Sequence, residues 1–133
     1  MAAGHEQVCF RLITVYEPQA PLAGEPYGLG AAYFYRLDQL ARAQAEMVSV
    51  KAEELLKGCF HSRPVCVTRV VELGQPAQVI VEAAENWDAD MIVVGSHGHG
   101  FWGRLALGSV SDAVVHHARC SVLVAKLDPE EAG

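Results

Sequence analysis

Residues 89–98 read Ala-Asp-Met-Ile-Val-Val-Gly-Ser-His-Gly, an apolar run that ends abruptly in glycine. Asp90–Val94 lacks the apolar–polar alternation of a half-buried strand, so we expect a short strand that is buried on both faces. Glycines follow at once from Gly95. Because ligands bind at the carboxyl ends of strands in open α/β sheets, this stretch predicts both a fold class and the place of a site.

Strand-like and helix-like patterns alternate on both sides of this stretch. We predict strands over Gln7–Glu17, Pro64–Leu73 and Ser121–Lys126, and helices over Ala32–Lys57, Pro76–Trp87 and Ser109–His117. The alternation predicts one α/β domain over residues 1–133, with a doubly wound parallel sheet and helices on both faces. The helix-spaced apolar residues of the long helix are expected to face the core: Leu37, Leu40, Ala41, Val48, Ala52, Leu55 and Leu56.

The composition excludes several classes of protein. The net charge is −6, which argues against nonspecific nucleic-acid binding, because a phosphate backbone requires clustered Lys and Arg. No apolar run reaches the roughly 18 residues of a membrane span, and the N-terminus lacks the features of a signal peptide. We therefore expect a cytoplasmic protein without a membrane partner. The cysteines form no C-x-x-C and are expected to be reduced and buried: Cys9, Cys59, Cys66 and Cys120.

A second stretch, Gly108-Ser109-Val110-Ser111-Asp112, begins a predicted helix. We expect Ser109 to be its N-cap, with Asp112 as a weak capping-box partner. The first-turn N–H groups then point outward with a partial positive charge, which suits a phosphate without any lysine. Gly95, Gly98 and Gly108 allow the backbone to approach phosphate oxygens, and the hydroxyls of Ser109 and Ser111 add donors.

Other chemistry is disfavoured by the same segment. The chain has no G-K-S/T of a P-loop and no G-x-S-x-G of a serine hydrolase. His97-x-His99 lies in a loop and could chelate a metal, but no carboxylate or cysteine lies close to it in sequence. His116-His117 is expected to end a helix, where the dipole favours a cation. We therefore predict no metal ligands at either pair. No general base is evident, so we predict no dedicated catalysis and at most slow ATP hydrolysis.

The spacing Gly95-x2-Gly98-x9-Gly108-Ser109 resembles the nucleotide-binding signature of the universal stress protein family. Gly74-Gln75-Pro76-Ala77 and the run Ala89–Gly98 are similar to two further motifs of that family. The resemblance covers nearly the whole chain and implies a flavodoxin-like fold and a stress-response regulator that binds an adenine nucleotide. ATP, with or without Mg²⁺, is the implied ligand.

The resemblance also implies roles for individual residues. The nucleotide would be held by Val15, Val94, Gly95, His97, Gly98, Gly108, Ser109, Val110 and Ser111. Among these, Val15 would contact adenine through its backbone, and Gly108–Ser111 would cradle the phosphates. The strand Ser121–Lys126 would pair with its twofold mate in a homodimer.

One departure from the family pattern affects these expectations. Family members begin with a strand that ends in an aspartate, followed by a helix, and the resemblance implies that this chain lacks that first unit. The strands Gln7–Glu17 and Asp90–Val94 would then pair directly or leave edges exposed. The alternative function is a dimerisation or interaction module of the same fold that binds no nucleotide.

Overall fold

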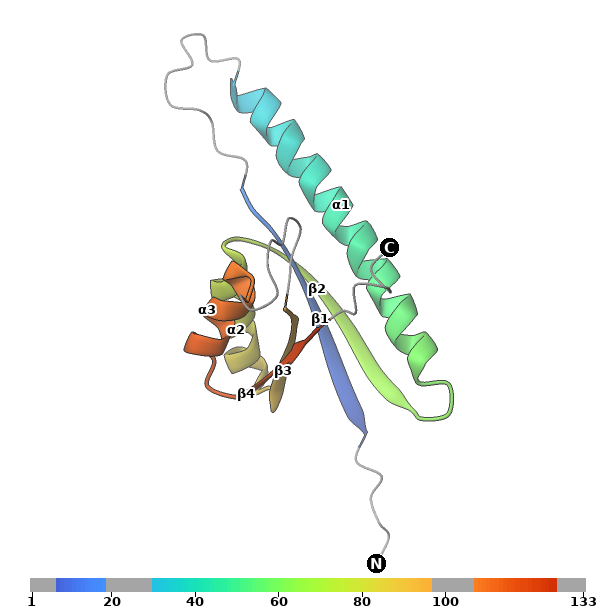
Figure 1. The fold of residues 1–133 in the computed structure, drawn as a ribbon. Coiled ribbons are helices and arrows are strands. Elements are labelled where there is room, and N and C mark those ends of the chain that lie inside the picture. The colour runs from blue at the N-terminus through green and yellow to red at the C-terminus, as the bar shows by residue number, and fades with distance from the viewer. Residues whose placement is uncertain (1–6, 19–29, 97–106, 127–133) are drawn as a thin grey trace, which may run out of the picture. The chain divides into compact units, whose positions relative to one another are not determined.

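The computed structural model describes residues 7–18, 30–96 and 107–126 (Figure 1). Strands and helices alternate in the predicted order, so the α/β prediction is confirmed. In chain order the elements are β1 (Val8–Tyr16), α1 (Gly30–Cys59), β2 (Val65–Leu73), α2 (Pro76–Trp87), β3 (Met91–Gly95), α3 (Ser109–His117) and β4 (Ser121–Ala125). Neither α1 nor α2 nor α3 is long and apolar enough to cross a membrane.

The strands form two parallel pairs. β1 pairs with β2 from Val8 opposite Val65 to Tyr16 opposite Leu73, and β3 pairs with β4 over five residues. Each pair is one strand–helix–strand crossover, the unit from which flavodoxin-like folds are built. The expected single sheet is two sheets in the described part of the chain, and β1 does not pair with β3. Each pair joins the two strands that flank one helix: α1 lies between β1 and β2 in the chain, and α3 lies between β3 and β4.

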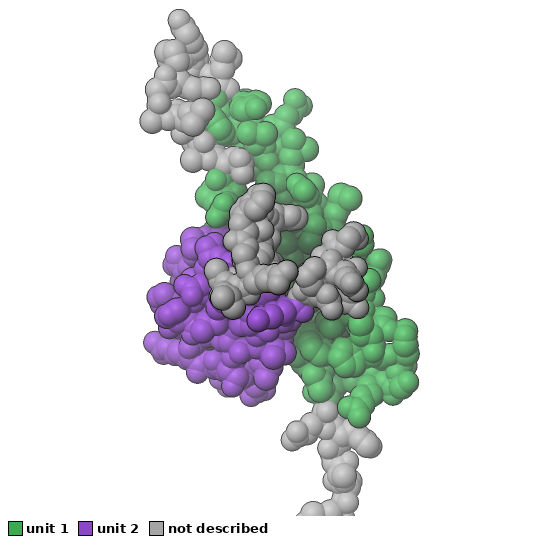
Figure 2. All heavy atoms as spheres, viewed as in Figure 1, with its two compact units in different colours: residues 1–74 green, residues 75–133 purple. Residues whose placement is uncertain are grey.

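The chain divides into two compact units, residues 1–74 and residues 75–133 (Figure 2). Each unit contains one strand pair and is described by itself. The organisation of residues 1–133 as a single domain stays a prediction.

In the first unit, α1 runs along one face of β1 and β2 (Figure 1). Its closest approach uses small side chains, because Ala45 and Ser49 are buried. The predicted core stripe is wrong at three of its residues: Leu40, Val48 and Leu55 are 61%, 55% and 64% exposed. Leu40 and Ser49 are nine residues apart, two and a half helical turns, and therefore lie on opposite sides of the helix. Two strands cover only one of those sides.

In the second unit, α2 and α3 pack on one face of β3 and β4 around a core of Ala77, Ile92 and Val114. The other face is bare in the described residues, with Met91 53% and Val93 59% exposed. The expectation that β3 is buried on both faces is therefore wrong. An uninterrupted apolar run shows that apolar and polar residues do not alternate. It does not show that a second layer of structure covers the other face of the strand.

Two backbone positions set the direction of α2. Gly74 has a φ of 153°, which favours glycine and turns the chain from β2 towards the helix. At the other end, Asp88 adopts the left-handed conformation and its N–H bonds back to Ala84 and Glu85. The next residue, Ala89, leads into β3 and donates to the Ala84 carbonyl at 2.9 Å.

The expectation that the cysteines are reduced is confirmed, but the expectation that they are buried is wrong. Cys9 and Cys59 are exposed, while Cys66 and Cys120 are half-buried, and all four are free thiols. Cys9 follows the alternation of β1 and lies on the face away from α1, since the neighbouring Phe10 stacks on Phe60 beside the helix. An apolar sequence context therefore indicated a strand but not which face of it is covered.

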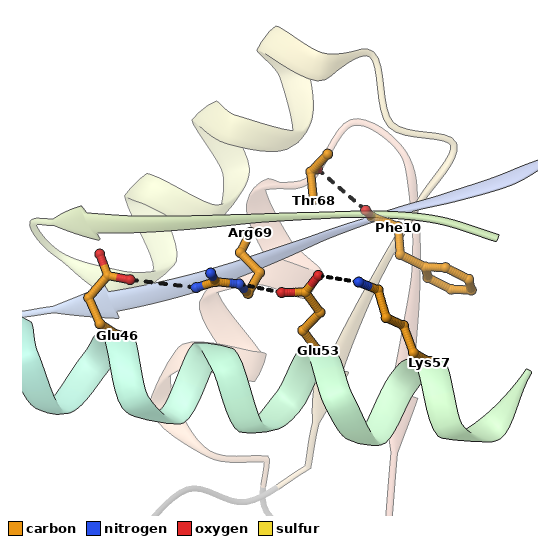
Figure 3. Close-up of polar contacts among 6 residues, drawn as sticks. All are labelled: Phe10, Glu46, Glu53, Lys57, Thr68 and Arg69. Atoms are coloured by element: carbon orange, nitrogen blue, oxygen red, sulfur yellow. Dashed lines mark hydrogen bonds and ion pairs between the residues drawn. The ribbon is translucent and has the colours of Figure 1, made fainter.

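Polar contacts fix α1 against β2 (Figure 3). Arg69 reaches from β2 to two carboxylates on the helix: its Nε donates to Glu53, and its Nη1 lies 3.5 Å from Glu46. Lys57 donates to Glu53 at 2.7 Å. The Lys57 hydrogen bond is the largest cause that lowers the pKa of Glu53; burial opposes it, and the Arg69 hydrogen bond adds to the lowering.

The lowered pKa of Glu53 makes its contribution to stability dependent on pH. A carboxyl group with a lower pKa in the folded state stabilises the fold above its unfolded pKa, about 4.3. That contribution is lost as the pH falls from there through the folded pKa. We expect Glu53→Gln to lower the urea midpoint at neutral pH, and the difference from the natural chain to vanish in acid. Glu54→Gln at the exposed neighbour is the control, and an acid-independent difference for Glu53→Gln would contradict the assignment.

Candidate functional site

Three hydrogen bonds gather the end of β3, the start of α3 and the end of β4. The Ser96 N–H donates to the Ala125 carbonyl at 2.8 Å, and the Gly108 N–H donates to the Ser96 carbonyl at 2.8 Å. The Ser111 hydroxyl donates to the Gly95 carbonyl. The predicted residues Gly95, Gly108 and Ser111 are thus brought together at the carboxyl end of a parallel strand, where ligands of open α/β sheets bind.

The start of α3 carries no side-chain cap. Its N-cap is Gly108, with φ −61° and ψ 156°, and Ser109 is the first helical residue, so the expected cap by Ser109 is wrong. The helical ladder begins with Asp112, whose N–H donates to the Gly108 carbonyl at 2.9 Å. The N–H groups of the first turn, on Ser109, Val110 and Ser111, have no acceptor in the helix itself, and no side chain caps them.

The other short helix of this unit shows what a capped start looks like. In α2 the Gln75 side chain accepts a hydrogen bond from the Gln78 N–H at 2.8 Å, and Pro76 occupies the first helical position without an N–H to satisfy. The first turn of α2 therefore has fewer donors to offer. At the start of α3, no side chain of the described residues caps the first-turn donors, which carry the partial positive charge that aligned peptide dipoles give a helix N-terminus.

The serine hydroxyls of α3 do different work. Ser111 is 5% exposed, and its one O–H is committed to the Gly95 carbonyl. It therefore holds the strand end against the helix, and its backbone N–H is the donor that it could offer to a ligand. Ser109 is exposed, and within the described ranges no hydrogen bond occupies its hydroxyl, so this is the hydroxyl that can turn to a ligand.

Ser96 is a site residue that sequence reasoning did not select. It is 2% exposed, yet its Oγ has no hydrogen-bond partner within the described part of the chain. Its backbone carries two of the three bonds that organise the site. The available signal was a serine directly after the last residue of an apolar strand, between Gly95 and His97.

The remaining predicted residues fall into three groups. Val94 and Val110 are half-buried and pack their side chains against the core, so their backbone would face a ligand. His97 and Gly98 lie outside the described residues. Val15 lies in β1, in the first unit, and is described apart from the rest.

The second unit also contains a groove between α2 and α3 with a volume of about 440 Å³. Glu82 and Glu85 line it, with Arg119 paired to Glu85 at 3.2 Å. Two carboxylates against one paired cation disfavour a phosphate there. Within residues 7–18, 30–96 and 107–126, no group of three or more His, Cys, Asp or Glu is placed to hold a metal ion.

The fold and the site together define a flavodoxin-like α/β protein with its candidate ligand site at the carboxyl end of β3. The model of the Universal stress protein family matches residues 1–126, and the chain belongs to that family. A universal stress protein from Thermus aquaticus is 35% identical over 121 residues, covering 87% of this chain and 77% of the relative. Two further curated universal stress proteins are matched over only 40% and 35% of their own length, so the chain spans less than half of those relatives.

Solved structures share the fold. Universal stress protein UspA from Lactobacillus plantarum superposes with a TM-score of 0.67 at 23% identity, covering 87% of this chain and 76% of that one. A universal stress protein family protein from Arabidopsis thaliana, solved with AMP bound, superposes with a TM-score of 0.50 at 20% identity, covering 94% and 68%. At these identities the likeness concerns the fold.

We expect Ser111→Ala to destabilise the protein by about 1 kcal/mol, because the Gly95 carbonyl loses a part-buried hydrogen bond. Ser109→Ala is the matched control one half-turn away: its hydroxyl is exposed, so its effect should stay within about 0.5 kcal/mol. Urea unfolding of both variants, followed by circular dichroism, measures the difference. Equal midpoints for the two variants would show that the Ser111 hydroxyl does not hold the strand end.

Proposed function

We propose that this protein is a regulator that binds an adenine nucleotide, with the phosphates on the first-turn N–H groups of α3. The observation that carries the proposal is the uncapped start of α3 at Gly108, set at the end of β3. Anions bind helix N-termini because several N–H groups converge on them along the positive end of the dipole. Membership of the universal stress protein family supports the same assignment.

The residues present fit a phosphate group. Gly108 has a φ that any residue can adopt, so its value to the site is the absence of a Cβ rather than a special conformation. The N–H groups of Ser109–Ser111 and the exposed Ser109 hydroxyl can donate to phosphate oxygens. A phosphate at this place therefore needs no lysine or arginine. Bound Mg²⁺ would neutralise phosphate charge, and it would be held chiefly by phosphate oxygens and water.

The adenosine part of the ligand rests on other residues. The proposed contacts are the backbone of Val15, the flank of Val94, and His97 and Gly98 near the ribose and phosphates. The Arabidopsis thaliana protein of the same fold holds AMP, which makes an adenine nucleotide the first ligand to test. ATP is the proposed ligand here because the family resemblance implies it; the first-turn N–H groups of α3 would donate to its phosphate oxygens.

The proposed output is a ligand-dependent conformation in the cytoplasmic stress response, with ATP hydrolysis at most slow. The Ser111 hydroxyl donates to the Gly95 carbonyl and not to a base. A serine nucleophile needs a base that takes its proton, so the geometry favours binding over acyl or phosphoryl transfer.

Titration calorimetry with ATP and Mg²⁺, and separately with AMP, tests the binding proposal. Gly108→Val should weaken ATP binding at least tenfold, because losing one or two charge-assisted hydrogen bonds costs about 1.5–3 kcal/mol each. The control is Gly58→Val in α1, where an added Cβ meets nothing within 4 Å. Folded natural chain that binds neither nucleotide at millimolar concentration would overturn the proposal.

The second candidate function is a dimerisation module that binds no nucleotide. It is favoured by β4, which pairs with β3 along one edge and with no strand of the described residues along the other. We propose that this free edge pairs with a second copy, giving a homodimer through Ser121–Lys126. Leu123 lies at the middle of β4 and is 52% exposed.

A twofold axis through the middle of β4 would place Leu123 opposite its own copy in an antiparallel pair. Leu123→Lys would then put like charges directly opposite each other, and we expect at least a tenfold weaker dimer by sedimentation equilibrium. Val115→Lys, on the exposed side of α3, is the control and should leave the mass unchanged. A dimer unaffected by Leu123→Lys would exclude the edge of β4 as the dimer interface. A dimer that binds no nucleotide would favour the second candidate function.

A further inference from the structure

Two cysteines, 57 residues apart in the sequence, stand side by side in the first unit. Cys9 of β1 and Cys66 of β2 are direct partners in the parallel register. Side chains alternate along a strand, so partners in register project from the same face of the sheet. That face is the one away from α1, because Phe10 and Arg69, which contact the helix side, have the opposite parity on their strands.

The separation fits a disulfide. Neighbouring strands lie about 4.8 Å apart, and the Cα atoms of disulfides are usually about 4.4–6.8 Å apart. Cys9 and Cys66 form the second pair of a ladder that starts at Val8 and Val65. A position so close to the end of a two-stranded ladder can adjust its backbone more easily than one in the middle, which helps the sulfur atoms approach.

The two thiols also influence each other's protonation. Cys9 and Cys66 share a side-chain hydrogen bond, and that bond is the largest cause that raises the pKa of the Cys9 thiol, ahead of burial and of repulsion by Cys66. The Cys9 thiol therefore keeps its proton to a higher pH than a free cysteine. Arg11 stands two residues beyond Cys9 on the same face of β1 and places a guanidinium on that side of the sheet.

Both sulfurs lie where a small oxidant can reach them. Cys9 is exposed and Cys66 is half-buried. The other two thiols have no such partner: no strand register sets Cys59 or Cys120 opposite a cysteine in the described residues. We propose that Cys9 and Cys66 form a peroxide-sensitive dithiol that closes reversibly to a disulfide.

The chemistry balances with hydrogen peroxide as the oxidant. The Cys66 thiolate attacks one peroxide oxygen, the O–O bond breaks, and a sulfenic acid forms as the leaving hydroxide takes up a proton to become water. The Cys9 sulfur then attacks the sulfenic sulfur; the S–S bond forms and a second water leaves with the Cys9 proton. Two thiols lose two electrons, and one peroxide is reduced to two waters. A dithiol reductant reverses the change.

The test uses the full chain with Cys59→Ser and Cys120→Ser, which leaves only the two paired thiols. The Cys59 change also removes an ambiguity: trypsin does not cut at Arg63 before Pro64, so Cys59 and Cys66 otherwise share one peptide. After hydrogen peroxide, catalase and maleimide, mass spectrometry of the unreduced digest should show the Cys9 and Cys66 peptides linked within one chain. Dithiothreitol should restore both thiols.

Two comparisons decide whether the strand register is responsible. The disulfide should form at least about tenfold faster in the folded chain than in urea. In the folded chain the strand register holds the two thiols next to each other, whereas in the unfolded chain they must first meet by diffusion. With Cys9→Ser added, Cys66 should instead be trapped by dimedone as a sulfenic acid. Equal rates in the folded and unfolded chain, a link only between chains, or two thiols that stay open to maleimide would each overturn the proposal.

Discussion

The hydrogen bond from the Ser111 hydroxyl to the Gly95 carbonyl is the contact on which the candidate site depends. A strand that ends at a ligand site leaves its last carbonyls without a ladder partner, and a buried carbonyl without a donor is costly. Ser111 satisfies one of them from the first turn of the following helix. The same bond sets that first turn beside the strand end, so the need to pair one carbonyl also decides where the amide donors of α3 stand.

Gly108 shows how the choice of N-cap residue shapes this start of a helix. Serine or aspartate at the N-cap would accept a hydrogen bond from an N–H of the first turn with its own side chain. Glycine makes no such bond, and its presence costs the helix only about a few tenths of a kcal/mol. The bond that Gly108 makes is instead from its N–H to the Ser96 carbonyl. The result is a helix start anchored through its backbone, with its first-turn donors uncapped by any side chain of the described residues. The buried Ser96 hydroxyl adds a polar group beside them that the described residues leave unpaired.

In the first unit, ion pairs as well as packing position the helix. Two strands give α1 a narrow surface, so packing alone leaves its rotation weakly specified, and large apolar side chains such as Leu40 remain exposed. Arg69, reaching to Glu46 and Glu53 two turns apart, fixes the helix on that surface with charge. The sheet face turned away from α1 carries Cys9 and Cys66, and the proposed redox chemistry needs only the β1–β2 register. It therefore does not require that a nucleotide binds at the start of α3.

The sequence by itself determined the order of strands and helices, their bounds to within a few residues, and the gathering of Gly95, Gly108 and Ser111. These follow from local rules: hydrophobic period, glycine and proline at element ends, and the meeting of a strand end with the next helix. Only the tertiary structure decided which faces are covered. It exposed Leu40, Met91 and Cys9, made Gly108 rather than Ser109 the N-cap, and brought Cys66 beside Cys9. Burial and strand register are properties of pairs of elements, so no stretch of sequence carries them alone.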